Sequence, residues 1–159
     1  MCGIIGYSGR LEAKQVLVNG LEQLEYRGYD SAGIAQITKE TVEITKTTGN
    51  VSVLKRKLEE KETIASHCGI GHTRWATHGG VTEGNAHPHQ VGKVTLIHNG
   101  IIENYKKIRE DYGKGILFHS QTDTEIAAML FDSFYHGNPE EAIWNTVAKL
   151  EGSYAFCIL

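Results

Sequence analysis

The chain has 159 residues, a length that fits one domain and falls short of two ordinary ones. Hydrophobic residues make up 40% of it and charged residues 22%, which is the composition of a globular protein. The formal net charge is −3, from 16 basic and 19 acidic residues mixed along the chain. The sequence therefore contains no basic stripe typical of nucleic-acid binding and no acidic tail.

The first third of the chain predicts one strand, one helix, a loop, a hairpin and a second helix. Residues 3–8 (GIIGYS) are short, apolar and bounded by glycine, which predicts a buried strand. Apolar residues at helical spacing predict a helix over 11–25, and the two glycines of 25–33 (EYRGYDSAG) predict a loop. Two alternating segments on either side of Lys39-Glu40 predict a hairpin, and residues 51–62 predict a short, charged helix.

The middle of the chain alternates predicted strands with one long irregular segment. Residues 68–73 (CGIGHT) predict a strand, and 74–92 form the longest irregular stretch, which in a compact domain is typical of a functional loop. Residues 93–100 (KVTLIHNG) predict a strand that ends at Asn99-Gly100. A helix is expected near 104–112.

The last third predicts two helices and a strand. The clearest helix lies within 122–137, ends at Gly137, and has a core face formed by Ile126, Met129, Leu130 and Phe134. Residues 139–150 repeat the helical spacing through Ile143, Val147 and Leu150, and the final GSYAFCIL predicts a strand. Because strands, helices and a new strand follow one another, the predicted fold class is α+β or layered α/β. The chain stops inside an apolar strand pattern, so we expect a fragment of a longer natural chain.

Cysteine usage and targeting signals predict the cytoplasm. No apolar run approaches the ~20 residues of a membrane-spanning helix, and the N-terminus lacks the basic segment of a signal peptide. The cysteines are Cys2, Cys68 and Cys157. An odd number without a C-x-x-C pair argues against a disulfide framework, so a reducing compartment is expected.

Cys2 is a candidate nucleophile because of its position. A lone free cysteine is usually a small buried hydrophobe. Removal of Met1 would instead give Cys2 an α-amine of its own, with an ordinary pKa of about 7.7–8.0, which can accept the thiol proton. One residue would then supply both the nucleophile and its base.

Two further segments carry polar groups with alternative interpretations. Asn99-Gly100 is a strong turn dipeptide, and its composition favours a turn, but a side-chain amide with a backbone N–H could also form an oxyanion hole. Thr122 and Glu125 match a capping box, in which Asp123 complements the helix dipole. Asp123 could also face a cleft and bind a substrate ammonium.

Arg74 and the histidines complete the candidate residues. A lone arginine is usually a solvated charge, but Arg74 beside Trp75 in a glycine-rich loop could clamp a carboxylate through two hydrogen bonds. The histidine-rich segments allow an alternative function, a zinc-dependent hydrolase or metal-binding module. Its ligands would be His72, His78, His87 and His89. The zinc spacings H-E-x-x-H and paired C-x-x-C are missing from the sequence, so metal binding is the weaker hypothesis.

Six segments in order give the chain a family resemblance: MCGIIGYSG, LEYRGYDSAGIA, GHTRWATHG, NAHPH, HNGIIENY and SQTDTE. Together they closely resemble the glutaminase domains of class II glutamine amidotransferases, within the N-terminal nucleophile hydrolase superfamily. The combination of EYRGYDSAG, RWATHG and HNGIIENY is similar to the glutamine–fructose-6-phosphate aminotransferase branch of that family. The resemblance covers the chain from Met1 to its last residue.

The resemblance implies a role for each candidate residue. Cys2, freed of Met1, is implied as the nucleophile that attacks the side-chain amide of L-glutamine, forming a thioester that water hydrolyses. Asn99 and Gly100 are implied as the oxyanion hole, with no metal and no cofactor. The remaining implied residues are Arg74 for the α-carboxylate, Asp123 for the α-ammonium, Thr77 and His78 in the pocket, Arg27 as support, and Trp75 in closure and ammonia passage.

The resemblance also implies a fold and a wider context. The expected fold is a four-layer α/β/β/α sandwich, incomplete at its C-terminal end, with residues 1–159 as the N-terminal portion of the glutaminase domain. Sugar-isomerase domains that bind fructose 6-phosphate and form most of a homodimer are absent from this sequence. Glutamine hydrolysis would supply ammonia for glucosamine 6-phosphate synthesis. Nucleic-acid and membrane partners are not expected.

Overall fold

The computed structural model describes residues 2–39, 41–61, 65–76 and 79–159. Thr77 and His78, both predicted pocket residues, lie outside these ranges, as does Met1. No helix in the described ranges is long and apolar enough to cross a membrane.

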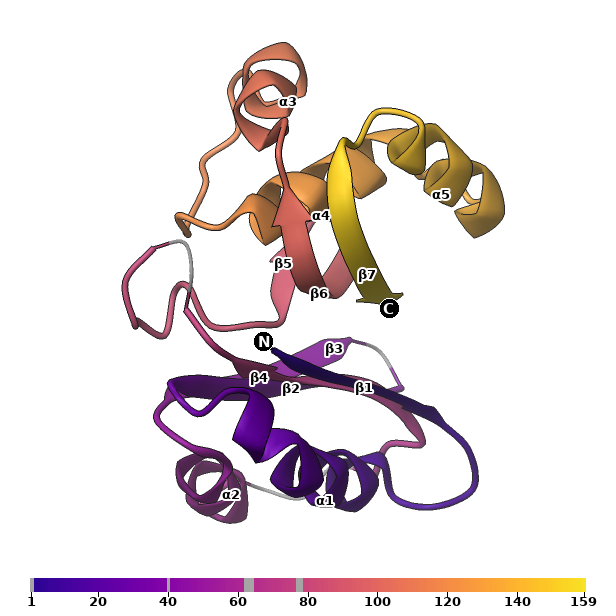
Figure 1. The fold of residues 1–159 in the computed structure, drawn as a ribbon. Coiled ribbons are helices and arrows are strands. Elements are labelled where there is room, and N and C mark those ends of the chain that lie inside the picture. Colours follow the sequence, from indigo (N-terminus) through magenta and orange to yellow (C-terminus); the bar gives the residue numbers. More distant parts are fainter. Residues whose placement is uncertain (1, 40, 62–64, 77–78) are drawn as a thin grey trace.

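The first half of the described chain forms an antiparallel sheet covered by helices on one face (Figure 1). The strand order is β1-β4-β2-β3. The strands are β1 (Gly3–Ser8), β2 (Ser31–Ile37), β3 (Val42–Thr48) and β4 (Cys68–Arg74). The covering helices are α1 (Ala13–Leu24) and α2 (Val51–Glu59), and a short 3-10 helix, η1 (Glu25–Arg27), follows α1.

Two expectations for this half need correction. The predicted strand over 3–8 forms, but it lies at the edge of the sheet, and of its residues only Gly3 is buried. The predicted loop over 25–33 is shorter than expected because β2 already begins at Ser31, which pairs with both Thr48 and Arg74. The predicted hairpin is confirmed, since β2 and β3 pair antiparallel along their whole length.

Local sequence explains helix α1 and its packing. The Glu12 carboxylate accepts the backbone N–H groups of Lys14 and Gln15, which caps the helix start. The buried side chains of the helix lie at the expected i, i+4 and i+8 spacing: Ala13, Leu17 and Leu21, joined by Val18. They form one core with Ala32 and Ile34 of β2 and with the buried face of α2.

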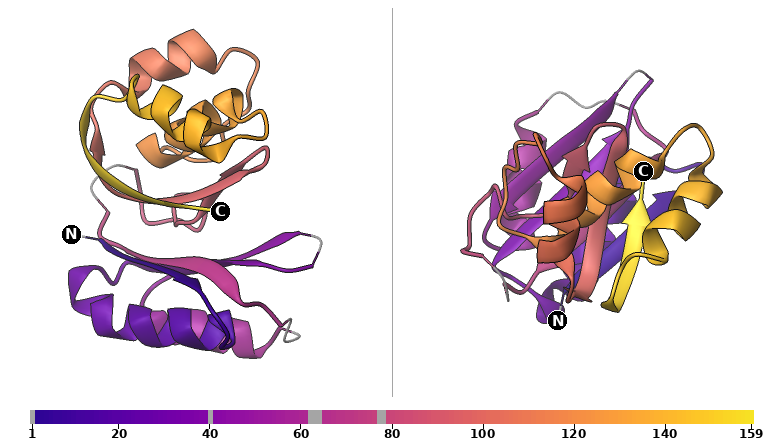
Figure 2. Two further views of the ribbon diagram at one scale, coloured as in Figure 1. Left: turned by 90° about the vertical axis from the view of Figure 1, so that its right-hand side faces the viewer. Right: turned by 90° about the horizontal axis from the view of Figure 1, so that it is seen from above.

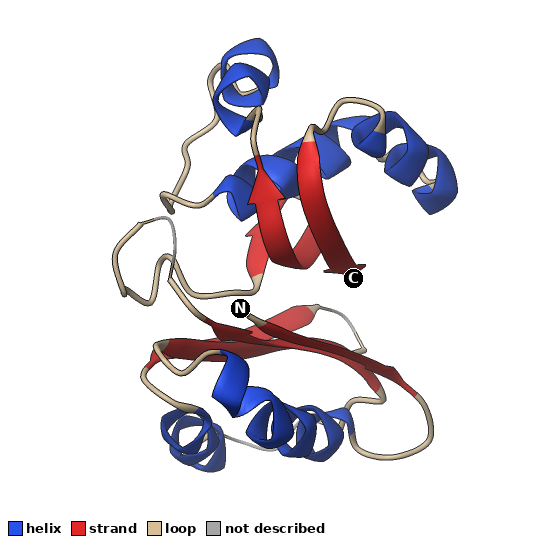
Figure 3. Ribbon diagram, viewed as in Figure 1, coloured by secondary structure: helices blue, strands red, loops and turns tan. Residues whose placement is uncertain are grey.

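The second half forms a smaller antiparallel sheet with its own helices (Figure 3). The described strand order is β5-β6-β7. The strands are β5 (His89–Val91), β6 (Val94–Ile102) and β7 (Gly152–Ile158), and the helices are α3 (Tyr105–Tyr112), α4 (Asp123–Phe134) and α5 (Pro139–Val147). Helix α4 packs on β5 and β6, and α3 and α5 pack against α4.

The buried face of α5 differs from the predicted one. The spacing predicts a face through Ile143, Val147 and Leu150. Leu150 is buried, but Ile143 is 41% exposed and Val147 only half-buried. Ala142 and Thr146 are the buried residues instead. Helix α5 therefore turns these small residues inward and leaves the larger apolar side chain at 143 partly exposed.

Strand β6 continues through Asn99-Gly100, so the turn favoured by composition is wrong. Asn99 pairs with Ala155 and Gly100 with Tyr154 of β7. Gly100 has φ +132°, and a Cβ there would lie 2.0 Å from the carbonyl oxygen of Ser153. Glycine is therefore required here, because the strand is distorted and the two backbones approach closely. Any other residue would be strained in this conformation.

The two sheets face each other with the helices outside, as Figure 2 shows. Ala35 and Ile70 of the first sheet and Ile97 of the second form the core between them, and β1 and β4 contact β6. The described chain thus has the order helices, sheet, sheet, helices, which confirms the predicted α/β/β/α sandwich.

Candidate active site

The thiol of Cys2 lies against the backbone of Trp75. Antiparallel pairing of Gly3 with Thr73 sets Cys2, just before β1, opposite Arg74 at the end of β4, so the thiol can reach the next residue, Trp75. The Trp75 N–H donates to Cys2 Sγ at 3.4 Å, and the thiol lies 3.8 Å from the Trp75 carbonyl oxygen. Burial raises the pKa of the Cys2 thiol, while the Trp75 backbone contact acts in the opposite direction because it favours the thiolate.

The segment that carries Trp75 is held by residues of the EYRGYDSAG motif. Gly28 packs so closely that a Cβ there would lie 2.6 Å from the carbonyl carbon of Arg74 and 2.8 Å from the Trp75 nitrogen. The Asp30 N–H donates to the Arg74 carbonyl at 3.2 Å, and the Asp30 carboxylate accepts the N–H of Ala76. Neither Gly28 nor Asp30 is among the candidate residues that the sequence indicates; the available signal was a glycine and an acid on either side of the motif's second tyrosine.

Asn99 joins the second sheet to the candidate nucleophile. Its side-chain Nδ2 donates to the backbone carbonyl of Cys2 at 3.2 Å, across the interface between the sheets. An amide nitrogen carries two hydrogens, so one N–H remains for a further acceptor. Asn99 and Cys2 are thus in direct contact, although 97 positions separate them.

The ladder register leaves the backbone N–H of Gly100 outside the pairing with β7. Thr95 and Leu159 exchange both of their backbone hydrogen bonds. Because successive residues of a strand point their backbone groups to opposite sides, Asn99 also faces β7, whereas Gly100 faces away. On that far side β5 pairs with β6 only as far as Leu96, so no strand formed by the described residues covers the Gly100 edge.

Asp123 lies at the start of α4 and is 9% exposed. Its Oδ2 accepts the backbone N–H of Ile102 at 2.9 Å, and its Oδ1 lies 3.8 Å from Nδ1 of His98. The carboxylate is therefore fixed to the end of β6, and Oδ1 keeps acceptor capacity that the Ile102 contact does not use.

The predicted capping box is only half present. Thr122 Oγ1 accepts the N–H of Glu125 at 3.4 Å, as expected for an N-cap. The Glu125 carboxylate does not return to Thr122, whose N–H donates to Ser120 Oγ instead. The Glu125 carboxylate instead accepts the backbone N–H groups of His119 and Ser120, at 2.9 and 2.7 Å, and the Ser120 hydroxyl. Glu125 thereby orders the loop that leads into Asp123.

A cavity between the two sheets brings most of the predicted residues together. Arg74 is almost fully buried at the end of β4, where its Nη1 donates to the Gly80 carbonyl at 3.1 Å. The predicted residues that line the cavity are Cys2, Arg74, Trp75, Gly100 and Asp123. His87, a ligand in the zinc alternative, and Thr122, the N-cap of α4, line the cavity as well, as do His98 and Thr124. Arg27 is not among the lining residues; its guanidinium contacts Tyr26.

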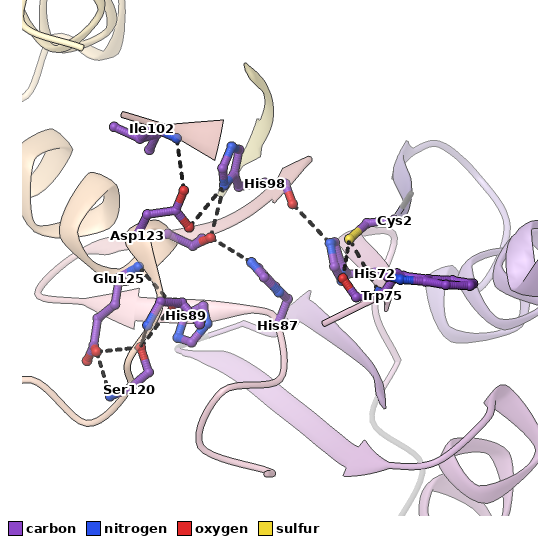
Figure 4. A network of polar contacts seen from close by, with 12 residues as sticks. Cys2, His72, Trp75, His87, His89, His98, Ile102, Ser120, Asp123 and Glu125 are labelled. Atoms are coloured by element: carbon purple, nitrogen blue, oxygen red, sulfur yellow. Dashed lines mark hydrogen bonds and ion pairs between the residues drawn. The ribbon is translucent and has the colours of Figure 1, made fainter. Parts of the chain in front are cut away.

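Buried histidines form a polar network next to this cavity (Figure 4). Thr124 Oγ1 lies 2.8 Å from His87 Nε2 and 3.1 Å from His98 Nδ1. Burial lowers the pKa of His72 to about 3 and the pKa values of His87 and His89 well below their usual range. Burial also lowers the pKa of His98, although the neighbouring acid at position 123 opposes that shift. These imidazoles are therefore neutral at physiological pH.

The histidine arrangement does not favour the zinc alternative. The rings of His72 and His87 stack with centroids 4.0 Å apart, and their Nε2 atoms contact different partners, the His98 carbonyl and Thr124. Within the described ranges no group of three or more histidine, cysteine or acidic side chains is arranged to hold a metal ion. His78, the fourth proposed ligand, lies outside those ranges.

Sequence comparison assigns the chain to a family. Residues 72–159 match the glutamine amidotransferase domain family, and because this match covers more than half of the chain, the protein belongs to that family. The likeness extends to solved structures: the glutamine phosphoribosylpyrophosphate amidotransferase of Bacillus subtilis, complexed with ADP and GMP, is 28% identical. It superposes with a TM-score of 0.84 over 100% of this chain and 35% of its own.

Curated relatives that are more similar in sequence than this structure share one enzyme name. Glutamine–fructose-6-phosphate aminotransferase (isomerizing) from Clostridium acetobutylicum is 50% identical over 162 aligned positions, which cover 100% of this chain. The enzyme of the same name from Bacillus subtilis is 45% identical over 99% of this chain. The chain spans only about a quarter of the length of these relatives, 26% and 27% respectively.

Proposed function

We propose that the chain hydrolyses the side-chain amide of glutamine, with Cys2 as the nucleophile. The observation that carries this proposal is the hydrogen bond from the Asn99 side chain, on the opposite sheet, to the backbone of Cys2. Cys2 itself lines a cavity together with Arg74 and Asp123, whereas Asn99 is not among the lining residues. A thiol, an amide donor, a buried cation and a buried carboxylate are the groups that an amino acid with a side-chain amide requires.

The proposed reaction proceeds in two steps. The Cys2 sulfur attacks the amide carbon of glutamine, the C–N bond breaks, and ammonia leaves with the proton taken from the thiol. Water then attacks the thioester, which releases glutamate and regenerates the thiol. The tetrahedral intermediate of each step carries a negative oxygen, for which the free N–H of the Asn99 side chain and the Gly100 N–H are the proposed donors.

The two charged side chains are proposed to fix the substrate. Arg74 would bind the α-carboxylate of glutamine, and Asp123 would bind its α-ammonium through Oδ1. With that end of the substrate fixed, the length of the glutamine side chain would place its amide at Cys2. We assign Thr77 and His78 to the same pocket. Trp75, 47% exposed beside the thiol, is assigned to pocket closure and ammonia passage, and Arg27 to support from outside the cavity.

The base of the reaction is proposed to be the α-amine of Cys2 after removal of Met1. The raised pKa of the thiol keeps it protonated at neutral pH, so a base is needed for attack. Among the described residues, Cys2 Sγ has its hydrogen-bonding contacts with the Trp75 backbone, and none of those contacts is with a histidine.

The wider function follows from the names of the relatives. We propose that residues 1–159 belong to the ammonia-supplying glutaminase domain of an enzyme that uses fructose 6-phosphate, bound outside this chain, to form glucosamine 6-phosphate. A homodimer of the longer protein and a reducing, cytoplasmic location are part of this proposal. The free state of Cys2, Cys68 and Cys157 supports that location.

Glutamate release from glutamine tests the proposed function. Mass spectrometry first establishes whether Met1 has been removed, and the same preparation is then assayed with glutamine and treated with an electrophilic glutamine analogue. We expect hydrolysis and a single adduct on Cys2, both abolished in Cys2→Ala. Cys68→Ala is the matched control and should keep both. Full activity of Cys2→Ala would refute the proposal.

A further inference from the structure

The uncovered side of β6 is held at two points by side chains from other elements. The carbonyl of His98 lies 3.0 Å from Nε2 of His72, and the N–H of Ile102 donates to Asp123. By the alternation of the ladder, the backbone N–H of Gly100 points to this same side, between those two contacts. Gly100, a proposed oxyanion donor, therefore lies between two residues, His98 and Ile102, whose backbone groups are held by hydrogen bonds.

The His72 contact has a defined direction. A carbonyl oxygen only accepts, so Nε2 of His72 carries the hydrogen and donates to His98. Its Nδ1 is buried without a partner among the described residues. His72 is 0% exposed, and a neutral imidazole with this tautomer is its stable form there.

His72 also belongs to the part of the fold that carries the thiol. It lies on β4, where it pairs with Ile4 of β1, two residues after Cys2. Its side chain crosses from the first sheet to β6 of the second, and Figure 4 shows the ring between the Cys2 region and the His98 carbonyl. One side chain therefore links the strand pair behind the nucleophile to the strand of the donors.

We propose that His72 is a positioning residue for the oxyanion hole: by holding the His98 carbonyl, it fixes the peptide that leads into Asn99-Gly100 and keeps both donors directed at Cys2. This inference rests on the proposed glutaminase function. The oxyanion exists only in the transition state and the intermediates, so a misplaced donor lowers kcat without weakening glutamine binding.

Variants at position 72 separate positioning from a structural role. His72→Leu keeps the bulk and removes the donor; we expect kcat for glutamate release to fall about tenfold or more, with KM changed less than about threefold, since complete loss of one donor costs about 10²–10³. His72→Gln, whose Nε2 can replace the imidazole donor, should recover most of kcat. Thr95→Val is the matched control on β6, because it removes a buried hydroxyl that has no partner among the described residues. It should leave kcat unchanged.

Nuclear magnetic resonance of the full chain tests the same inference without turnover. Long-range nitrogen–proton correlations should report the Nε2–H tautomer for His72, and His72→Leu should shift the Asn99 and Gly100 amide signals while Thr95→Val does not. An Nδ1–H tautomer overturns the inference. So does a folded His72→Leu whose kcat stays within twofold of the parent, or whose KM rises in proportion to its loss of kcat.

The two proposals fail in different ways. A parent chain that has lost Met1 and still releases no glutamate contradicts the proposed function, and the role of His72 in the oxyanion hole falls with it. An active parent with an unaffected His72→Leu contradicts the inference alone.

Discussion

Oδ2 of Asp123 accepts the backbone N–H of Ile102 at 2.9 Å, which ties the start of α4 to the end of β6. The contact uses one carboxylate oxygen and leaves Oδ1 on the side of His98 and the cavity. Asp123 thus has a structural task and a proposed binding task on different atoms, and substitutions can separate them.

Asp123→Asn should impair glutamine binding while preserving the fold. Its Oδ1 can still accept the Ile102 N–H, but the negative charge that is proposed to bind the α-ammonium is lost. Charge-assisted hydrogen bonds contribute about 1.5–3 kcal/mol, so KM for glutamine should rise roughly 10–100-fold. Steady-state kinetics and thermal unfolding measure the two effects. Asp123→Leu, which removes both contacts, should also lower the melting temperature; an unchanged KM in Asp123→Asn would contradict the assigned role.

Gly28→Ala should displace the backbone that contacts the thiol. The added Cβ would lie 2.6 Å from the Arg74 carbonyl carbon and 2.8 Å from the Trp75 nitrogen, so this segment must shift, at a cost of about 1–3 kcal/mol. We expect slower labelling of Cys2 by an electrophilic glutamine analogue and lower stability in denaturant. Gly6→Ala is the control, because its Cβ meets only Cys157 Sγ at an ordinary 3.6 Å. Equal effects of the two substitutions would argue against a specific role for Gly28.

Stability should fall as the pH drops below about 6.5. An unfolded His72 takes up its proton near its ordinary pKa of 6.5, whereas the folded chain resists protonation of His72 until about pH 3. Between these values the unfolded state binds more protons, so each such histidine lowers the free energy of unfolding by ~1.4 kcal/mol per pH unit. Urea unfolding between pH 7.5 and 4.5 measures the slope. His72→Gln should reduce it by about one proton; identical slopes for parent and variant would contradict the buried neutral state.

Glu125→Gln should loosen the loop before α4. Its carboxylate accepts from two backbone N–H groups and the Ser120 hydroxyl, and an amide presents a donor where one of its acceptor oxygens stood. Loss of a buried acceptor costs about 1–3 kcal/mol in the free energy of unfolding. Glu141→Gln is the control at the same position of α5, where the side chain is exposed and a change within about 0.5 kcal/mol is expected. Chemical denaturation of both variants gives the comparison.

Periodicity and cap chemistry were sufficient for most elements of this fold. The Thr122 cap, the β2–β3 hairpin and the final strand form where the sequence predicts them. The helix from Asp123 forms as well, but it ends at Phe134, before the predicted end at Gly137. The errors occurred where tertiary contact overrides local preference. Asn99-Gly100 is a turn by propensity, but pairing with β7 extends the strand through it. The Glu125 side chain bonds outside the capping box because the preceding loop offers three donors together.

The sequence by itself determined the chemical inventory of this protein: a thiol at position 2, a cation at position 74, a carboxylate at position 123 and an amide at position 99. Their order along the chain also indicated the family. Only the tertiary structure decided which of them meet, because closure of two sheets over one core brings Asn99 to Cys2 across 97 positions. It also decided that Gly28, Asp30 and His72 hold the backbone around the cavity. Such positioning depends on strand register and close packing, and no local pattern in the sequence encodes either.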